Sequence, residues 1–573
     1  MGKKGLGIIL AIAILVSVFP SAAIAEDGGG VYATVTRSQV YFDGIRAYEI
    51  GGFNIERNNY FKLRDLANAF SGTLSNFDVA WNAEKNEIEI LTGRDYTVPS
   101  GDASSTYYWS VGQYWAVRTG SRLVIDGETR EITAYNIDGS NYFKLRDLAE
   151  LIPFDLEWDA ETESVLIYSR LPEGARRVAT SFSSPYSYNL MPSGNSYSNL
   201  GTMTSYMAEK GDGTIDAIRV NFAEKTIVID SYDEKYELIS SRTVAFELDL
   251  FGAFYSGERY NYIVFGQENQ EESATKEVIR IVKYDKAFNR VDSVAVKDCF
   301  TVRPFYSTTG RMSESGDELV LHTARMRYRT EDGLNHQSQL TVIVDTNTMK
   351  VKNSNDLGRF QRNHVSHSFD QLVRYDGKAH ILVDLGDAYP RSVVLMKSDG
   401  SGGYLEANLL NIAGGIGDNY TGVGIGGLEV SSSHYLVALA SVDQSGSAPN
   451  DERQDVIVCA MPKNSVNDSA VNRITIAKYT GTSKTASVPM LCAAGTDKYL
   501  LTWQEFNHTE YIGDSDYSVM KYVFLDKTGN PISETATLDG YILSRCEPVI
   551  YNNAAVWFTD NGGGRVFYTI PLD

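Results

Sequence analysis

The hydrophobic positions in the front part of the chain repeat. The stretch Asn59–Ala67, with sequence NYFKLRDLA, returns unchanged at 141–149. Its apolar residues, together with Phe70, fall three and four positions apart, which places them on one face of a short helix. Asn58 or Asn59 is expected to cap that helix. Because chance does not repeat a stretch of this length, the pattern predicts a duplicated unit with one short helix in each copy.

Strands are predicted around each of these helices. Asp-Gly pairs at 43–44 and 126–127 precede the helices and predict tight turns, because glycine tolerates positive φ. After each helix, apolar and polar residues alternate as in half-buried strands. The alternating apolar residues are Phe77, Val79 and Trp81 in the first copy and Phe154, Leu156 and Trp158 in the second. The sequence therefore predicts two small α/β repeats, over residues 33–92 and 115–169.

From residue 175 to the end, the pattern changes to short apolar strands with almost no helical periodicity. Strong strands recur about every 45–65 residues, a period typical of four-stranded propeller blades with loop insertions. They are predicted at Ala217–Phe222, Tyr260–Phe265, Glu318–His322, His380–Val383, Tyr435–Ala440, Tyr499–Trp503 and Ala555–Phe558. Residues 175–573 are therefore predicted to form an all-β propeller of about seven blades, with six or eight open. Two packed β-sandwiches are the alternative, and they would show no regular spacing.

The end of the chain predicts how such a ring would close. Pro548–Asp573 has room for only about three strands. A strand around Arg177–Phe182 can supply the fourth, which would leave no open sheet edge.

The repeated pattern also carries a family resemblance. Asp-Gly, then NYFKLRDLA, then Trp-Asn/Asp-Ala-Glu and Ile-Glu-Ile resembles the copper amine oxidase N-terminal-like, or stalk, domain, which exported proteins of Gram-positive bacteria often carry. The resemblance covers about residues 33–169 in two copies and implies a structural appendage, not the oxidase. Every Asn-Tyr here lacks the following acidic residue of a topaquinone precursor, and no His-x-His pair is present to hold copper.

The chain begins with the features of a secretory leader. Lys3 and Lys4 precede the apolar run Leu6–Phe19, and Ala23-Ile24-Ala25 forms an Ala-x-Ala cleavage site. We expect cleavage after residue 25 and a bacterial protein that is secreted, either released or associated with the cell wall. A retained membrane anchor is the weaker alternative because the run is short for a span. No membrane span is expected in the mature chain.

Charge narrows the partners that can be expected. Asp and Glu number 73 against 52 Lys and Arg, giving a formal net charge of −21. Nucleic acid is therefore not expected as a partner, since phosphates need Lys and Arg. Solubility is the ordinary explanation for such a surface. The four cysteines are too few for a disulfide scaffold, although Cys492 and Cys546 could lie close as a bridge or as buried thiols.

Two motifs suggest cofactors that we do not expect. Residues 422–427 satisfy Gly-x-Gly-x-x-Gly, but a strand is predicted after them where a dinucleotide site needs a helix. A tight inner blade strand explains the glycines better. His364 and His367 are three apart on a predicted strand or turn, so they would point to opposite faces of a strand and are not expected to share a metal ion.

The candidate ligand-binding residues lie in one predicted blade. Ser366–Gln371 followed by Gly386–Arg391 resembles a signature of uncharacterised bacterial propeller proteins and brings His367, Asp370, Asp387 and Arg391 to the ends of successive strands. An internal network, with Asp387 paired to Arg391, is the competing interpretation. Among the aromatic residues that could stack on a sugar, Trp503 is the further candidate. Most of the 36 tyrosines are explained by strand formation.

No catalytic constellation is recognisable. The chain has no Gly-x-Ser-x-Gly elbow and no sialidase box of the type Ser-x-Asp-x-Gly-x-x-Trp. The sequence therefore favours a non-enzymatic protein whose stalk domains present a propeller that binds a glycan, a peptide or a protein. The alternative is an extracellular polysaccharide-active enzyme with its site near His367, Asp387 and Arg391. A purely structural wall component is a third class.

Overall fold

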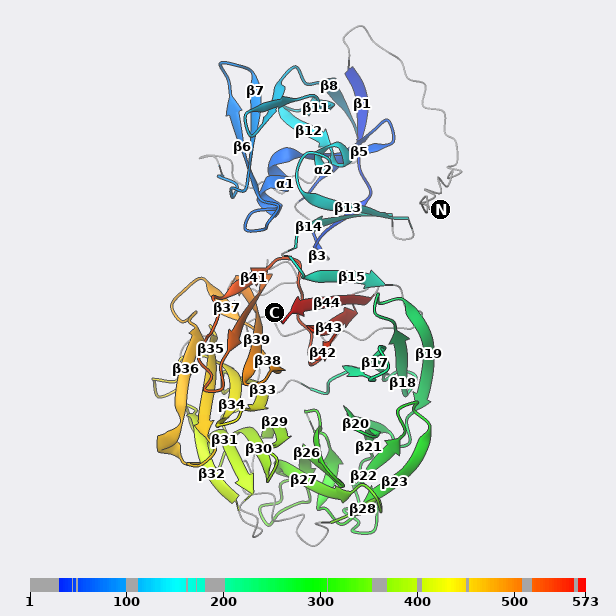
Figure 1. Ribbon diagram of the computed structural model, residues 1–573, viewed down its shortest axis with the longest axis vertical. Coiled ribbons are helices and arrows are strands. Elements are labelled where there is room, and N and C mark those ends of the chain that lie inside the picture. The colour runs from blue at the N-terminus through cyan, green and yellow to red at the C-terminus, as the bar shows by residue number, and fades with distance from the viewer. Residues whose placement is uncertain are drawn as a thin grey trace, which may run out of the picture. The chain divides into compact units, whose positions relative to one another are not determined.

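The protein is described here by a computed structural model. It describes residues 30–43, 45–47, 50–98, 112–160, 163–171, 173–180, 201–306, 308–352, 368–398, 404–449, 453–507, 518–560 and 565–572. The predicted leader, at residues 1–25, lies outside these ranges. Two compact units are present (Figure 1). The first contains the described residues of Met1–Val40, Tyr48–Ser71 and Ser75–Leu156, and the second those of Tyr41–Ala47, Gly72–Leu74 and Glu157–Asp573.

A closed six-stranded barrel forms the centre of the first unit. Its strands, in order around the barrel, are β1 (Gly30–Val35), β4 (Gly52–Ile55), β5 (Asn58–Lys62), β12 (Ser140–Lys144), β11 (Ala134–Ile137) and β8 (Gln113–Arg118). Aromatic and aliphatic residues of both copies fill the barrel, among them Phe53, Tyr60, Tyr135 and Tyr142. Closure leaves the barrel without an open sheet edge.

The barrel brings the two sequence copies together around an approximate two-fold axis. Strands β5 and β12 are the same stretch of the repeat, and they pair antiparallel with Phe61 opposite Phe143, its own counterpart in the second copy. Strands β1 and β8 are also counterparts, and they close the other side of the barrel. Each copy therefore supplies half of one barrel.

The prediction of two separate α/β repeats needs correction, because two such units are not evident. The helices are short: α1 spans Leu63–Ala69 and α2 spans Leu145–Ala149. The first half of each repeated block forms strand β5 or β12. Lys62, and neither Asn58 nor Asn59, precedes α1, without a side-chain cap. Tyr60 and Phe61 are both buried, because the strand packs on both faces.

Two further sheets also mix strands from the two copies. One has the order β10 (Glu128–Arg130), β9 (Arg122–Ile125), β7 (Glu87–Thr92) and β6 (Phe77–Asn82). The other has the order β13 (Phe154–Asp159), β14 (Ser164–Ser169), β2 (Gln39–Phe42) and β3 (Ile45–Arg46). The predicted turn at Asp126-Gly127 is present, with φ of 50° and 84°.

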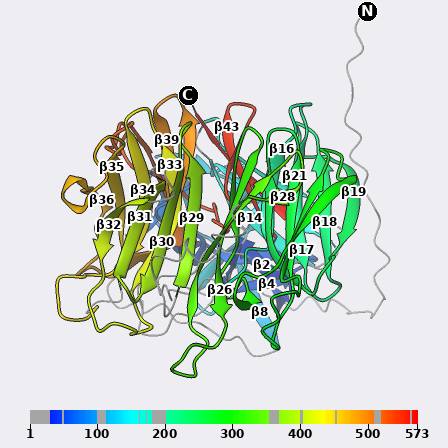
Figure 2. The same ribbon diagram turned by 90° about the horizontal axis from the view of Figure 1, so that it is seen from below.

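Seven antiparallel sheets make up most of the second unit, and Figure 1 shows them following one another around a ring, an arrangement consistent with a β-propeller. In Figure 2 the sheets stand side by side. The first sheet contains β16 (Ser205–Glu209), β17 (Ile215–Asn221), β18 (Thr226–Tyr232) and β19 (Leu238–Ala245); the second contains β20 (Leu250–Ser256), β21 (Asn261–Gly266), β22 (Ile279–Tyr284) and β23 (Arg290–Val296); and the third contains β24 (Thr301–Pro304) and β25 (Arg311–Ser315), which both pair with β26 (Glu318–Arg327), then β27 (Gln337–Asp345) and β28 (Lys350–Val351). The fourth sheet contains β29 (Ser368–Tyr375), β30 (His380–Asp387), β31 (Arg391–Ser398) and β32 (Tyr404–Asn411), and the fifth contains β33 (Val423–Val430), β34 (His434–Ser441), β35 (Asp455–Pro462) and β36 (Asn472–Ala477), with a 3-10 helix, η1, at Asp468–Ala470. The sixth sheet contains β37 (Lys484–Ala486) and β38 (Met490–Gly495), which both pair with β39 (Lys498–Asn507), then β40 (Ser518–Leu525) and β41 (Ala536–Leu538), and the seventh contains β42 (Val549–Tyr551), β43 (Ala554–Asp560), β44 (Arg565–Pro571) and β15 (Arg176–Thr180).

The recurring strands expected from the sequence are confirmed. Each of the seven lies within or overlaps the second strand of one sheet: β17, β21, β26, β30, β34, β39 and β43. These strands are buried on both faces, which gives them the continuous apolar runs that made them recognisable. Two packed sandwiches are not observed among the described residues.

The predicted closing strand is also present. β15 pairs antiparallel with β44, from Arg176 opposite Thr569 to Thr180 opposite Arg565. The Tyr541 hydroxyl lies 3.0 Å from the carbonyl oxygens of both Arg176 and Thr569. The last sheet therefore joins a strand that precedes the other sheets in the sequence to the strands that end the chain.

Four charged side chains are buried between the first and last sheets of the ring. Arg219 of β17 lies 3.1 Å from Asp230 of β18 and 3.4 Å from Asp560 of β43. Arg565 of β44 contacts the same two carboxylates at 3.1 and 3.0 Å. Each of the four side chains is at most 4% exposed. Opposite charges alternate around this group, so no charge in it is left uncompensated.

The cysteines form no disulfide: Cys299, Cys459, Cys492 and Cys546 are free thiols, which settles the open question in favour of unbridged residues. Within the described ranges, the helices are too short and too polar to cross a bilayer.

Candidate functional site

Two of the predicted candidates flank the turn between β30 and β31. Asp387 and Arg391 are partners in the strand register, and both are buried. Arg391 donates from Nε to the Ala413 carbonyl at 2.9 Å and from its Nη atoms to the Asp418 and Tyr420 carbonyls at 2.6 Å each. Burial lowers the pKa of Arg391, and Asp387 and Asp418 oppose that change. The guanidinium holds the chain between β32 and β33, which favours the interpretation of an internal network.

The candidate Trp503 packs in the core. It lies in β39, is 1% exposed, and donates from Nε1 to the Tyr479 hydroxyl at 2.9 Å. The Tyr479 hydroxyl in turn donates to Glu505 at 2.8 Å. The indole ring has no face open to a ligand, because β39 is a second strand with a neighbouring sheet on each side.

Asp370 lies near the start of β29, and His367 lies outside the described residues. Asp370 is 1% exposed and accepts from the Gln371 N–H at 2.9 Å and from the Thr308 hydroxyl at 3.4 Å. Burial raises the pKa of Asp370, although the guanidinium groups of Arg311 and Arg545 act in the opposite direction. Of the predicted candidates, Asp370 is therefore the one that lies beside the charged residues described next.

A cavity of about 540 Å³, here called the inner cavity, opens among the inner strands of the ring. Its walls come from β16, β20, β25 and β29 and from residues 547–549, which lead into β42. These strands form the edges of their sheets that face the centre of the ring (Figure 1). The lining residues of β16, β20 and β29 lie toward the C-terminal ends of these strands. Arg374 pairs with Ile381 at one end of β30, whereas Asp387 lies at its other end.

Aromatic side chains supply part of the apolar lining of the inner cavity. Tyr206, Phe254 and Tyr255 line it, and the rings of Tyr206 and Phe254 meet edge to face at 5.6 Å. The Tyr255 hydroxyl accepts from the backbone N–H of Glu314 at 3.3 Å. Burial raises the pKa of both tyrosines, so they stay neutral and keep their hydroxyl protons at physiological pH.

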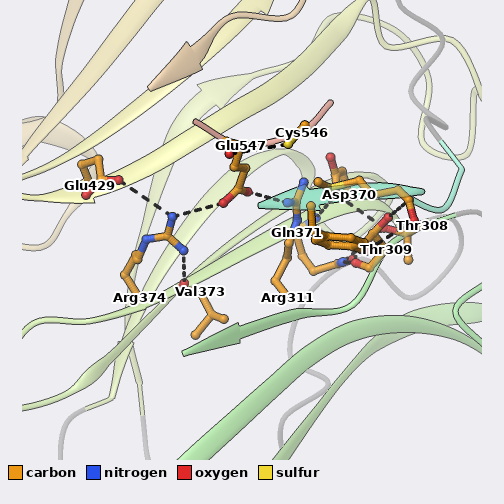
Figure 3. A network of polar contacts seen from close by, with 12 residues as sticks. Thr308, Thr309, Arg311, Asp370, Gln371, Val373, Arg374, Glu429, Cys546 and Glu547 are labelled. Atoms are coloured by element: carbon orange, nitrogen blue, oxygen red, sulfur yellow. Dashed lines mark hydrogen bonds and ion pairs between the residues drawn. The ribbon is translucent and has the colours of Figure 1, made fainter. Parts of the chain in front are cut away.

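A chain of charged side chains runs along the wall of the inner cavity and ends at Glu429, which is not part of the lining (Figure 3). Glu547 contacts Arg311 at 2.6 Å through Oε1 and Arg374 at 3.6 Å through Oε2. Arg374 also faces Glu429, from β33, at 3.8 Å. Arg374 and Glu547 are 34% and 45% exposed, so water in the cavity reaches both. Arginine and glutamate therefore alternate along one wall, with donors and acceptors side by side.

Burial and charge act differently on the two glutamates of this chain. Burial raises the pKa of Glu429, and Arg374 only partly compensates. Burial also acts on Glu547, but Arg311 and Arg374 outweigh it and hold the pKa of that carboxyl below its ordinary value. The two carboxyls on either side of Arg374 thus have their pKa values moved in opposite directions.

A lysine adds a further cation to the cavity wall. Lys286 donates from Nζ to the Ser256 hydroxyl at 2.9 Å and to the Gly257 carbonyl oxygen. Burial lowers the pKa of Lys286, and the nearby Glu314 and Glu209 oppose the change. Backbone and hydroxyl oxygens, more than a carboxylate, satisfy this ammonium group.

Sequence reasoning missed the inner cavity residues. Arg311, Arg374 and Glu547 come from three different sheets and share no motif. Each lies within or just before an ordinary strand pattern. The available signal was a charged residue near the end of an inner strand, which many strands of this chain also show.

The Gly-rich stretch lies on an inner strand, which was the explanation preferred over a dinucleotide-binding site. Gly424, Gly426 and Gly427 are in β33, and strand β34 follows, not a helix. A Cβ atom at Gly426 would lie 1.5 Å from the Pro489 carbonyl oxygen, so the neighbouring sheet requires glycine there. No cluster of three or more side chains able to hold a metal ion occurs in the described part of the chain, and His364 lies outside it.

Comparison with known proteins gives only distant structural likenesses. No family model and no curated protein sequence matches the chain. A quinonprotein alcohol dehydrogenase-like protein from Bacteroides thetaiotaomicron matches with 10% identity and a TM-score of 0.34, covering 66% of this chain and 81% of that one. Phage phi92 endosialidase matches with 10% identity and a TM-score of 0.31, covering 66% and 75%.

An ACO/RPE65 chimera matches with 10% identity and a TM-score of 0.28, covering 60% of this chain. The match covers 63% of the chimera, so this chain spans less than two thirds of its length. Likenesses at this level do not indicate a ligand or an activity for the present protein, so both have to be argued from its own residues.

Proposed function

We propose that this protein is an exported recognition protein whose propeller binds a glycan in the inner cavity and does not transform it. The observation that carries this proposal is the cavity itself. Its volume of about 540 Å³ lies within the range of ligand pockets. Its wall combines aromatic rings with a few charged side chains that still have hydrogen-bonding capacity.

The chemistry of the wall fits a sugar. The apolar face of a pyranose ring packs on aromatic side chains, and its hydroxyl groups both donate and accept hydrogen bonds. Tyr206, Phe254 and Tyr255 offer rings, whereas Arg311, Arg374 and Glu547 offer donors and acceptors. A peptide or protein partner would have to enter the same cavity through a side chain or terminus, and binding measurements separate these cases.

Export and presentation are part of the proposal. The basic, apolar and Ala-x-Ala segments at residues 1–25 are expected to direct the chain out of the cell. The duplicated first unit would then present the propeller at the cell surface, as its resemblance to stalk domains implies. The acidic net charge of −21 is unfavourable for nucleic acid as the partner.

Filling the inner cavity tests the binding proposal. Val549 lines the cavity at the start of β42, and its neighbour Ile550 does not line it and is 41% exposed. Adjacent residues of a strand point to opposite faces, so Val549→Trp should fill the cavity and Ile550→Trp should leave it open. The measurement is binding of the wild type and both variants to an array of bacterial and plant glycans.

The two variants give opposite expectations. Glycans retained by the wild type and Ile550→Trp should be lost by Val549→Trp, with unchanged thermal unfolding. If the array detects no glycan, or if both variants bind equally well, the inner cavity is not a glycan site.

A glycoside-cleaving enzyme is the second candidate, and one observation favours it. The carboxyl groups of Glu429 and Glu547 lie on either side of Arg374 and have their pKa values moved in opposite directions. Glycoside cleavage uses two carboxyl groups whose pKa values are moved apart, one upward and one downward, and these two shifts have those directions. An enzyme of this kind would use the inner cavity, which Glu547 lines, in place of the β30–β31 turn.

Product release distinguishes an enzyme from a binding module. The glycans retained by the wild type are incubated with protein, and new reducing ends are counted. Release that is lost in both Glu429→Gln and Glu547→Gln would establish the enzyme. Retention without release, over hours and across acidic to neutral pH, would establish the binding module.

A further inference from the structure

Resting on the proposed function, we infer that the inner cavity selects an uncharged, polyhydroxylated ligand, a neutral sugar, one of whose hydroxyl groups bridges Arg374 and Glu547. The inference names a ligand class for the cavity. It follows from a gap in the ion-pair chain, from the charges around that gap, and from which ligand groups can satisfy both sides of it.

The gap lies between Arg374 and Glu547. Their nearest atoms, Nη2 and Oε2, are 3.6 Å apart, beyond the usual 2.7–3.2 Å of an N–H···O bond. Arg374 donates from Nη1 to the Val373 carbonyl at 3.3 Å. A guanidinium has five N–H donors. Donors of Arg374 and lone pairs of Glu547 are therefore both available on the cavity side.

A hydroxyl group satisfies both sides of this gap. Its oxygen accepts from the Arg374 guanidinium while its proton is donated to Oε2 of Glu547. A ligand carboxylate accepts from Arg374 but has no proton for Glu547. A ligand ammonium donates to Glu547 but cannot accept from Arg374. Only groups that donate and accept at once complete the chain.

The charges of the wall act against charged ligands of either sign. Arg311 and Arg374 face Glu547 and Glu429, at 2.6, 3.6 and 3.8 Å. An anion near Arg374 also meets Glu547, and a cation near Glu547 also meets Arg311 and Arg374. Contact between like charges is unfavourable once a ligand has displaced the water around them. This repulsion contributes to specificity because it weakens the binding of charged ligands.

The remaining charged residues of the lining are balanced in the same way. They are Lys210, which lies 3.7 Å from Asp216, together with Lys286, Glu209 and Glu258. Arg311 and Arg374 hold the pKa of Glu547 below its ordinary value despite burial. This carboxylate is therefore ionised at neutral pH and can accept a hydrogen bond from a hydroxyl group.

Two matched pairs of oligosaccharides test the inference by titration calorimetry on the full-length mature protein. Hexagalacturonate is compared with its methyl ester, which has the same backbone without the negative charges. Chitosan hexamer is compared with N-acetylchitohexaose, which lacks the positive charges. The neutral member of at least one pair should bind about tenfold or more tighter than its charged counterpart.

Two variants should shift this preference in opposite directions. Glu547→Gln removes the counter-charge of Arg311 and leaves Arg374 with Glu429 alone, so neutral binding should weaken and hexagalacturonate binding should strengthen. Arg374→Gln should weaken neutral binding and strengthen binding of the chitosan hexamer. Glu534→Gln, an exposed residue outside the cavity, is the matched control and should change neither. Thermal unfolding checks that each variant is folded.

The outcomes separate this inference from the function on which it rests. If the wild type prefers the charged members and Val549→Trp abolishes that binding, the cavity binds glycans but the inference is wrong. If neutral binding survives Glu547→Gln and Arg374→Gln unchanged, the bridging hydroxyl is also wrong. If no member of either pair binds, both the inference and the glycan proposal are overturned.

Discussion

At the scale of single residues, one group of four buried charges pairs opposite signs across two sheets. The group of Arg219, Asp230, Asp560 and Arg565 joins the first and last sheets of the ring with contacts of 3.0–3.4 Å. Such a group need not be more stable than well-packed apolar residues. Removing one member, however, leaves a buried charge unpaired, and that is strongly destabilising.

We therefore expect Asp560→Asn to destabilise the propeller by about 3–5 kcal/mol, because Arg219 and Arg565 lose a buried counter-charge. Urea unfolding followed by tryptophan fluorescence measures the change. Lys225→Met, which breaks an exposed ion pair with Asp249, is the control and should have little effect. Equal effects of the two substitutions would contradict a special role for burial.

A second prediction concerns the pH dependence contributed by Asp370. Burial raises the pKa of Asp370 in the folded protein. A raised pKa means that its contribution to stability is present below the unfolded pKa, near 3.9, and is lost as the pH rises through the folded value. Asp370→Asn does not titrate. The stability of this variant relative to the wild type should therefore increase from about pH 4 to pH 7.

The measurement is the free energy of unfolding of both proteins at several pH values in this interval. Asp249→Asn serves as the comparison, since Lys225 lowers the pKa of that exposed carboxyl. A constant difference between Asp370→Asn and the wild type across the interval would mean that Asp370 does not titrate abnormally.

At the scale of elements, the repeated block shows why helix periodicity can mislead. Tyr60, Leu63 and Leu66 have helical spacing, but the chain is extended through Lys62 and helical only from Leu63. Strand β5 gains hydrogen bonds from β4 on one side and β12 on the other. The partner β12 belongs to the other copy of the repeat, so the local pattern could not show it. Tertiary pairing therefore overrides the helical spacing.

The closing strand permits a prediction at the same scale. β15 covers the edge of β44 through its backbone pairing and is held there by the Tyr541 hydroxyl. A protein of residues 201–573 lacks β15 and should expose the edge of β44. We expect it to unfold about 5 °C or more below a protein of residues 171–573 and to self-associate.

Calorimetry and light scattering of the two proteins measure this difference. Adding a peptide of residues 173–182 should restore part of the lost stability to the shorter protein, because it can occupy the free edge. Equal unfolding temperatures and a monomeric shorter protein would mean that β15 does not close the ring.

At the scale of the whole molecule, duplication gave one barrel and not two domains. β5 and β12 pair as counterparts, with Phe61 opposite Phe143, and β1 pairs with its own counterpart β8. A barrel built this way needs two copies of the half, but it does not need them on one chain. A single half has two unpaired edges, which a second identical half would cover.

We therefore expect a protein of residues 30–98 to form a homodimer in which β5 pairs with β5 of the second chain. Light scattering and circular dichroism measure its mass and strand content. Phe61→Asp places a charge at the symmetric pair and should give an unfolded monomer. Glu84→Gln, at an exposed position outside the strands, is the control and should leave the dimer intact. A folded monomer would contradict the shared-barrel interpretation.

The sequence by itself determined the recurring strands and the strand that closes the ring. In strands such as β34, the residues from Tyr435 to Ala440 are buried on both faces. A strand of this kind needs apolar residues at successive positions, and such a run can be recognised in the sequence alone. The duplication was likewise visible in the chain alone. Among the predicted site residues, Asp370 is the one that the structure brings within the electrostatic reach of Arg311, although it does not line the inner cavity.

Only the tertiary structure decided how the copies pair and where the cavity lies. Arg311, Arg374 and Glu547 come from separate sheets that meet at the centre of the ring, and no local pattern links them. The roles of Arg391 and Trp503 were decided in the same way. A side chain that holds carbonyl oxygens or packs in the core has the same sequence signature as one that faces a ligand. The difference lies in contacts made by residues far apart in the chain.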